Sequence, residues 1–241
     1  MIAKQVPNKA VQVVWSREDD IQNDFYRPAA VHQFNACLDD NGYPLAFRQR
    51  FSTPAINATL GPAKTAGADE ADGSGNMLYR VPNRSCEYSM LDSGVFRGWW
   101  RAVHTTHGTF ALESFMDELA HAAGKDELDF RLALIDEYKM KLPAQSKEFP
   151  IQHERLKGVL VEVAKISNWE TTKLPKGHAY GVACAIDHLS YCAEVVEVSI
   201  ENNQPVIHNV YCAVDCGPVV NPNGARAQLE GGIHQGLSVA L

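Results

Sequence analysis

The chain has 241 residues, 45% of them hydrophobic and 21% charged, which excludes a disordered protein and allows one large or two small domains. Its formal charge of −7 argues against a nucleic-acid-binding protein, because phosphate contacts need clustered lysines and arginines. No apolar run approaches the roughly 18 residues of a membrane span, so membrane insertion is not expected either.

Residues 1–80 predict a β-rich segment. Val11, Val13 and Trp15 alternate with polar or smaller residues, which is the pattern of a half-buried strand. The run Arg17-Glu-Asp-Asp20 follows. It predicts a solvated helix start, because acidic side chains in the first turn interact favourably with the helix dipole.

A β-hairpin is expected next. Residues 27–37 have an extended pattern, Asn41-Gly42 is a strong hairpin turn, and residues 44–51 form the return strand. The small and polar residues 52–76 predict an exposed linker that lies outside the core.

Residues 81–175 predict a loop followed by helices. The clearest helix carries an apolar stripe and ends at Gly124, and its charged side chains, Glu113 among them, are expected on the surface. A second helix is expected over residues 127–138, and another stripe indicates a third. The two stripes consist of Leu112, Phe115, Met116, Leu119, Ala122 and Ala123, and of Leu156, Val159, Leu160 and Val163.

Residues 176–241 predict a β-hairpin and a glycine-rich helix. Apolar residues recur with a period of two on either side of an Asn202-Asn203 turn. Asn221-Pro222 starts the closing helix, with Asn as the N-cap and Pro at the first helical position. Strands, then helices, then strands again predict the α+β class. The helix reaches Leu241 inside an apolar run, so we expect a piece that is truncated at both ends.

The closing helix is the first candidate binding element. Interior glycines such as Gly231 and Gly232 each cost about 0.5–1 kcal/mol relative to alanine, which indicates that something must approach the backbone. Gln228 and Gln235 lie on the same helical face, and their amides match the edge of a fused nitrogen heterocycle. The alternative is a helix packed tightly on a strand, with the glutamines merely solvated.

The second candidate is the segment Gly94-Val-Phe-Arg-Gly-Trp-Trp-Arg101. Its glycines allow unusual backbone angles, its arginines are forked donors for anions, and its aromatic side chains can stack on a flat ligand. The alternative is a Trp-rich strand end packed in the core.

Three further patterns favour structural roles. His104 and His107 lack the intervening Glu of a zinc hydrolase, so that function is a weaker alternative. Asp215 ends a predicted strand and is expected to fix a loop. The 6 cysteines are too few for a disulfide scaffold and include no C-x-x-C pair, so buried thiols are expected rather than a metal site.

Motifs in these segments resemble the molybdenum hydroxylases, the molybdopterin-binding large subunits of the xanthine dehydrogenase and aldehyde oxidase family. The motifs are Arg17-Glu-Asp-Asp20, Asp24-Phe-Tyr-Arg-Pro28, Gly94-Val-Phe-Arg-Gly98, Glu113-Ser-Phe-Met-Asp-Glu-Leu-Ala-His-Ala-Ala-Gly124, Val214-Asp-Cys-Gly217, Val220-Asn-Pro222 and Gln228-Leu-Glu-Gly-Gly232. The resemblance covers most of the chain.

The resemblance implies an oxidoreductase that hydroxylates an electron-poor carbon of an aromatic N-heterocycle or an aldehyde. The oxygen would come from water, and the electrons would pass to molybdenum. The implied cofactor is a molybdopterin, in its cytosine dinucleotide form, and the implied partner is a small subunit with 2Fe–2S clusters. It also implies a molybdopterin-binding-domain fold of mixed sheets and packed helices.

Within the loop, the resemblance assigns Phe96, Arg97 and Gly98 to the segment that approaches the oxygen ligands of the metal. Trp99 matches an aromatic residue that contacts the flat substrate. Trp100 stands where relatives of the xanthine type have Gly, so a pocket of different shape is expected.

Within the closing helix, the resemblance assigns Gln228 to the pterin and places Gly231 and Gly232 in the same binding motif. We expect this helix to converge with the loop at residues 94–101. The glutamate base of the family is expected beyond Leu241, so these 241 residues alone are expected to be inactive. The alternative is a non-catalytic binding module that keeps the fold without the metal.

Overall fold

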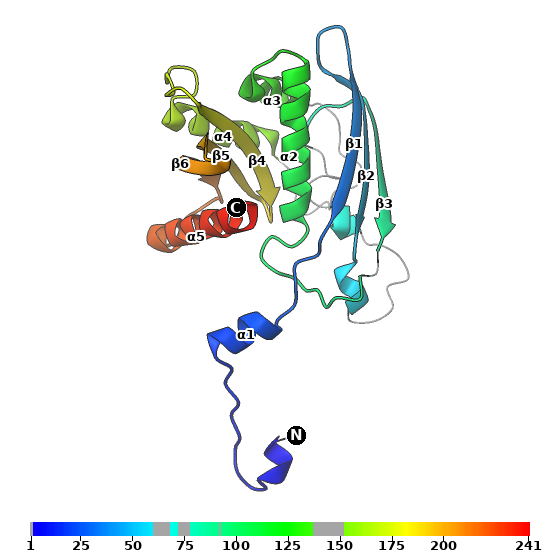
Figure 1. Cartoon of the computed structure of the whole chain (residues 1–241), viewed down its shortest axis with the longest axis vertical. Coiled ribbons are helices and arrows are strands. Elements are labelled where there is room, and N and C mark those ends of the chain that lie inside the picture. The colour runs from blue at the N-terminus through cyan, green and yellow to red at the C-terminus, as the bar shows by residue number, and fades with distance from the viewer. Residues whose placement is uncertain (1, 60–67, 72–77, 92, 137–151) are drawn as a thin grey trace.

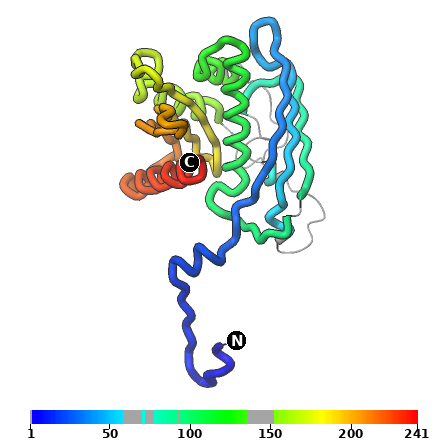
Figure 2. Tube along the Cα trace, in the orientation of Figure 1, coloured from blue at the N-terminus to red at the C-terminus, as the bar shows by residue number. Residues whose placement is uncertain are grey.

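The computed structural model describes residues 2–59, 68–71, 78–91, 93–136 and 152–241. Two three-stranded sheets lie on either side of helix α2 (Thr105–Ala122), and an N-terminal arm carries helix α1 (Arg17–Asn23) away from them (Figures 1 and 2). Among the described helices, none combines the length and the apolar character that crossing a bilayer requires. Three short 3-10 helices lie at Ile2–Gln5, Ile56–Thr59 and Ala68–Ala71.

The first sheet contains the predicted hairpin. Strand β1 (Val31–Leu38) pairs antiparallel with β2 (Pro44–Thr53), and β3 (Asn83–Met90) pairs parallel with β2. Gly42 adopts a φ of 76°, a left-handed conformation that favours glycine, so the turn prediction at Asn41-Gly42 is confirmed.

The second sheet is an antiparallel meander. Strands β4 (His178–Asp187), β5 (Ser190–Glu201) and β6 (Gln204–Asp215) pair in chain order. Asn202 and Asn203 both have positive φ, 51° and 61°, as a type I′ turn requires. The predicted hairpin is therefore confirmed, and β4 adds a strand that the periodicity did not delimit.

The helices form the core with both sheets. Phe115 of α2 stacks on Phe34 of the first sheet, with 5.0 Å between ring centroids. Helix α4 (His153–Ser167) packs on one face of the second sheet, and α3 (Glu127–Asp136) lies against α2 and α4. The predicted stripes are confirmed, because their fully buried members include Leu112, Met116, Leu156, Leu160 and Val163.

The predicted strand at Val11, Val13 and Trp15 is wrong. This stretch forms no strand, and the Val13 and Trp15 side chains are 60% and 58% exposed. Alternation favours a strand only where a neighbouring strand supplies hydrogen bonds and one face is buried, and residues 11–15 have neither. The helix start after it is confirmed, since Ser16 caps α1 by accepting a hydrogen bond from the Asp19 N–H at 3.1 Å.

The predicted exposed linker over residues 52–76 is wrong over much of its described part, although Asn57 is exposed. Thr53, Ala55, Ile56 and Glu70 are each at most 1% exposed. The segment contacts residues distant in sequence, since the Ala55 carbonyl accepts a hydrogen bond from Arg97 Nε at 3.0 Å, and composition cannot distinguish such a segment from a solvated loop. Residues 60–67 and 72–76 of the predicted linker lie outside the described residues.

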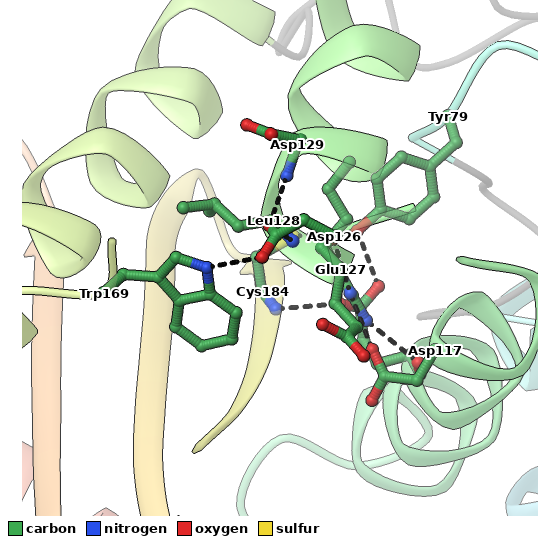
Figure 3. A network of polar contacts seen from close by, with 10 residues as sticks. Tyr79, Asp117, Asp126, Glu127, Leu128, Asp129, Trp169 and Cys184 are labelled. Atoms are coloured by element: carbon green, nitrogen blue, oxygen red, sulfur yellow. Dashed lines mark hydrogen bonds and ion pairs between the residues drawn. The ribbon is translucent and has the colours of Figure 1, made fainter. Parts of the chain in front are cut away.

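Glu113 is buried within a polar network, so the prediction that it lies on the surface is wrong. Its carboxylate accepts hydrogen bonds from Arg131 Nε at 2.9 Å, Tyr79 Oη at 2.8 Å and the Cys184 N–H at 2.9 Å. Arg131, on α3, is fully buried and also donates to Asp117 Oδ1 at 2.7 Å. Figure 3 shows Tyr79, Asp117 and Cys184 around this network. From the helical pattern alone, a charged residue is expected at the surface. Glu113 is buried because Arg131, on another helix, pairs with it.

We predict that Glu113→Gln destabilises the chain by about 3–5 kcal/mol, because it removes the buried carboxylate of Arg131 and leaves only the partly exposed Asp117 to balance the guanidinium charge. The measurement is urea denaturation at neutral pH. Glu118→Gln, on the exposed side of the same helix, is the matched control and should change stability by less than about 0.5 kcal/mol. Equal effects of the two substitutions would contradict the network's role.

Candidate functional site

The two candidate segments meet in space. Arg101 Nη2 donates a hydrogen bond of 2.9 Å to the Gln228 carbonyl oxygen, across 127 residues of sequence. A Cβ atom on Gly232 would lie only 3.6 Å from the same Nη2. The expected convergence of the loop with the closing helix is therefore confirmed, and a guanidinium forms the contact.

The closing helix, α5 (Pro222–Ala240), begins as predicted. The Asn221 side chain accepts a hydrogen bond from the Gly224 N–H at 3.0 Å, and Pro222 occupies the first turn. None of the residues of α5 is buried, so the alternative of a helix packed tightly on a strand is wrong in the described chain. Gln228 is exposed, and a Cβ on Gly231 would meet open space.

The loop before α2 is held by the N-terminal arm. The Tyr26 N–H donates to the Phe96 carbonyl and the Gly98 N–H donates to the Tyr26 carbonyl, both at 3.1 Å. A Cβ on Gly98 would approach Phe25 Cβ to 2.9 Å, so only glycine fits without a shift. This close approach gives a physical reason for Gly98 that does not depend on any ligand.

The aromatic side chains of the loop point to solvent. Phe96 is 72% exposed and Trp99 is 55% exposed, so the alternative of a Trp-rich strand end in the core is wrong. Singly exposed aromatic residues are normal, and only a contiguous exposed apolar patch points to a contact with another molecule.

The sequence predicts that the Arg97 guanidinium is available to bind an anion, and the structure differs. The residue is only 8% exposed, and its guanidinium donates to the Ala55 carbonyl at 3.0 Å and to the Val95 carbonyl at 3.1 Å. Arg97 therefore fixes the loop to the segment after β2. Sequence reasoning missed this role because the acceptors are backbone atoms, which carry no residue signature.

Arg27 also fixes the position of this loop, a role that sequence reasoning did not predict. It donates to the Arg101 carbonyl at 2.8 Å, the Val103 carbonyl at 3.1 Å and Thr106 Oγ1 at 2.7 Å, and its guanidinium lies 5.2 Å from the Trp100 ring centroid. Burial lowers the pKa of Arg27. Val103 has a φ of 39°, a strained conformation for a β-branched residue, and Arg27 binds its carbonyl.

The histidines near α2 form a half-buried chain of polar contacts. His107 Nδ1 lies 3.1 Å from His32 Nε2, and His32 Nδ1 lies 3.2 Å from Gln49 Nε2. Burial lowers the pKa of His107 to about 4. In the described part of the chain, neither His104 nor His107 belongs to a three-ligand group, so the structure does not support the zinc hydrolase alternative.

Asp215 fixes the loop that leads into α5, as predicted. Its two carboxylate oxygens each accept a hydrogen bond of 2.7 Å from Arg155, and Oδ1 accepts another from the Gly217 N–H at 3.0 Å. The hydrogen bonds from Arg155, with that from Gly217, lower the pKa of Asp215 from 3.8 to about 2.

The prediction of buried thiols is only partly correct. Cys184 is buried, and Cys192 and Cys212 are half-buried. The other three, Cys37, Cys86 and Cys216, are exposed. Two of the exposed thiols lie on strands of the first sheet, Cys37 on β1 and Cys86 on β3, where Cys86 is paired with Gln49.

We predict that Asp215→Asn destabilises the chain at neutral pH. A carboxyl group whose pKa is lower in the folded than in the unfolded state stabilises the fold above about pH 4, and this contribution is lost as the pH falls through about 2. Chemical denaturation across this range should show the two chains becoming equally stable at the acid end. Asp20→Asn, in the exposed helix α1, is the control. A difference between Asp215→Asn and wild type that stays constant with pH would contradict the assignment.

Two family models, both described as molybdopterin cofactor-binding domains, match the chain at residues 1–134 and 111–241. The beta subunit of isoquinoline 1-oxidoreductase from Brevundimonas diminuta is 30% identical over 242 residues, which cover 97% of this chain and 29% of that protein. Membrane-bound aldehyde dehydrogenase (pyrroloquinoline-quinone) from Gluconacetobacter polyoxogenes is 26% identical over 263 residues, which cover 100% of this chain and 33% of that protein. The chain thus spans about a third of the length of these relatives.

Quinoline 2-oxidoreductase from Pseudomonas putida 86 has a similar fold, with a TM-score of 0.52 and 15% sequence identity. The similarity covers 76% of this chain and 24% of that one. It confirms the predicted fold class, an α+β arrangement of mixed sheets and packed helices.

Proposed function

We propose, because the chain belongs to the molybdopterin cofactor-binding domain family, that it forms a cofactor-facing part of the large subunit of an oxidoreductase. The proposed reaction is hydroxylation of an electron-poor carbon of an aromatic N-heterocycle or an aldehyde, with oxygen from water. The observation that carries the proposal is the Arg101 hydrogen bond to Gln228, which joins the exposed aromatic loop to the glycine-rich helix.

The residues on this surface fit a flat, polar, anionic group. The exposed Gln228 amide offers both a donor and an acceptor to the edge of a pterin ring. Gly231 leaves open space beside the helix, and the guanidinium of Arg101 brings positive charge next to Gly232. We propose that Gln228, Gly231 and Gly232 bind the pterin and that Arg101 favours its phosphate.

The loop residues have separate proposed roles. Phe96 and Gly98 border the space for the oxygen ligands of the metal, and Arg97 positions this loop through its bonds to backbone carbonyls. Trp99 is proposed to stack on the flat substrate, since an exposed indole ring offers a large apolar face. When bound, the molybdenum–pterin group supplies the electron acceptor that these side chains lack.

Cofactor form and partner are further parts of the proposal. We propose the cytosine dinucleotide form of molybdopterin and a small partner subunit with 2Fe–2S clusters that carries the electrons away. Two relatives, the isoquinoline oxidoreductase and a nicotinate dehydrogenase, are each named as one subunit of an enzyme, which supports an assembly of more than one chain. Their names, with that of the aldehyde dehydrogenase, support heterocycles or aldehydes as the substrate class.

We predict that Gln228→Ala lowers the molybdopterin content of the assembled enzyme, because the pterin loses the hydrogen bonds of one amide. Pterin is measured by fluorescence after oxidation, and molybdenum by mass spectrometry. Gln204→Ala, at the exposed β5–β6 turn, is the matched control and should leave both contents unchanged. Trp99→Ala should also leave both unchanged, but it should alter the ratio of kcat/KM between a heterocycle and an aldehyde.

Cofactor content that is equal in Gln228→Ala and wild type would contradict the assignment of this helix. Wild-type enzyme that contains neither pterin nor molybdenum when assembled with its partner would favour the non-catalytic module instead.

A further inference from the structure

Strands β5 and β6 bring three metal-binding side chains together on one face of the second sheet. Cys192 Sγ lies 3.7 Å from Cys212 Sγ, and a carboxylate oxygen of Glu194 completes a group whose ligand atoms all lie within 4.8 Å of one another. Cys192 and Glu194 share a face because they are two residues apart on β5, and Cys212 pairs directly opposite Glu194 on β6. The spacing of the cysteines in the sequence gives no sign of this, because strand pairing alone brings them together.

The other strand residues that pair with this group are apolar. On β4, the residues paired with Cys192 and Glu194 are Ala185 and Ala183, whose side chains are small. On β6, Val214 pairs with Cys192. This face is opposite the one that α4 covers, and all three ligand residues are half-buried.

We propose that Cys192, Glu194 and Cys212 bind one zinc ion, with the fourth position left to water. For a tetrahedral ion with Zn–S bonds of about 2.3 Å, the two sulfurs should lie about 3.8 Å apart, which matches the observed contact. Thiolate ligands select zinc among the common divalent ions, and a carboxylate is a hard ligand that copper(I) disfavours.

The Glu194 carboxylate is half-buried on this face. Burial raises the pKa of its carboxyl group, and a hydrogen bond with Cys212 lowers it. The positive charge of a cation beside a partly buried carboxylate compensates it. A bound zinc ion would supply that charge and would brace edge strand β6 against β5, just ahead of the loop that Asp215 fixes.

Binding must be linked to protons. Zinc binds cysteine in its thiolate form, so a thiol ligand must lose its proton on binding. Each thiol releases its proton to solvent as the Zn–S bond forms, so the affinity should rise with pH. None of the residues proposed for pterin or substrate belongs to this group, so the two proposals fail independently.

The test is cobalt substitution of the metal-free, reduced chain. We expect stoichiometric cobalt to produce thiolate-to-metal charge-transfer absorption, zinc to abolish it, and Cys192→Ser or Cys212→Ser to eliminate it. Glu194→Gln should retain the absorption but weaken the affinity. Cys37→Ser, at an exposed thiol on β1, is the control and should bind like wild type. Absence of the absorption, or its persistence in both serine variants, would overturn the proposal.

Peptide mapping of alkylated wild type keeps the test decisive if a variant does not fold. Zinc should slow alkylation of Cys192 and Cys212 and leave that of Cys37 unchanged. Equal labelling with and without zinc would overturn the proposal. A disulfide between Cys192 and Cys212 would also overturn the proposal, if it forms in the chain isolated without reductant and with zinc present. Oxidised sulfurs cannot bind the ion.

Discussion

The buried contact between Arg131 and Glu113 constrains the rest of this structure. The Glu113 carboxylate accepts hydrogen bonds from three segments: from Arg131 of α3, from the Tyr79 hydroxyl and from the Cys184 N–H of β4. Helix α2, which carries Glu113, is thereby fixed against the second sheet while Phe115 holds it to the first. Apolar residues of equal volume could supply similar stability, so the ion pair matters chiefly because it specifies one arrangement. The position of the loop before α2 depends on that arrangement.

Arginine contacts extend this constraint to the candidate site. Arg27 and Arg97 bind backbone carbonyls around the loop, Arg155 holds Asp215 before α5, and Arg101 binds α5 itself. A planar guanidinium with several donors can join two or three carbonyls, which no other side chain does as well. Most of these contacts use backbone carbonyls, whereas Arg155 binds the Asp215 carboxylate, and none of them uses the side chains of Gln228 or Trp99.

Local chemistry made part of the fold predictable. The Asn41-Gly42 and Asn202-Asn203 turns, the Asn221 cap and the apolar helix stripes depend on neighbours in sequence, and the structure confirms each of them. The errors concern tertiary partners. The arm at residues 11–15 has no strand beside it, Glu113 is buried by a residue on another helix, and Arg97 is occupied by the carbonyl of Ala55. Motif resemblance predicted that the loop and α5 converge, but the roles of their side chains stay predictions.

Hydrogen–deuterium exchange of the assembled large subunit, with and without molybdopterin, tests most directly whether the loop and α5 form one cofactor-facing surface. Cofactor loading should slow exchange together in residues 94–101 and in α5, and leave strands β1 to β3 of the first sheet unchanged. Protection that appears in neither segment, or in only one of them, would contradict a shared surface.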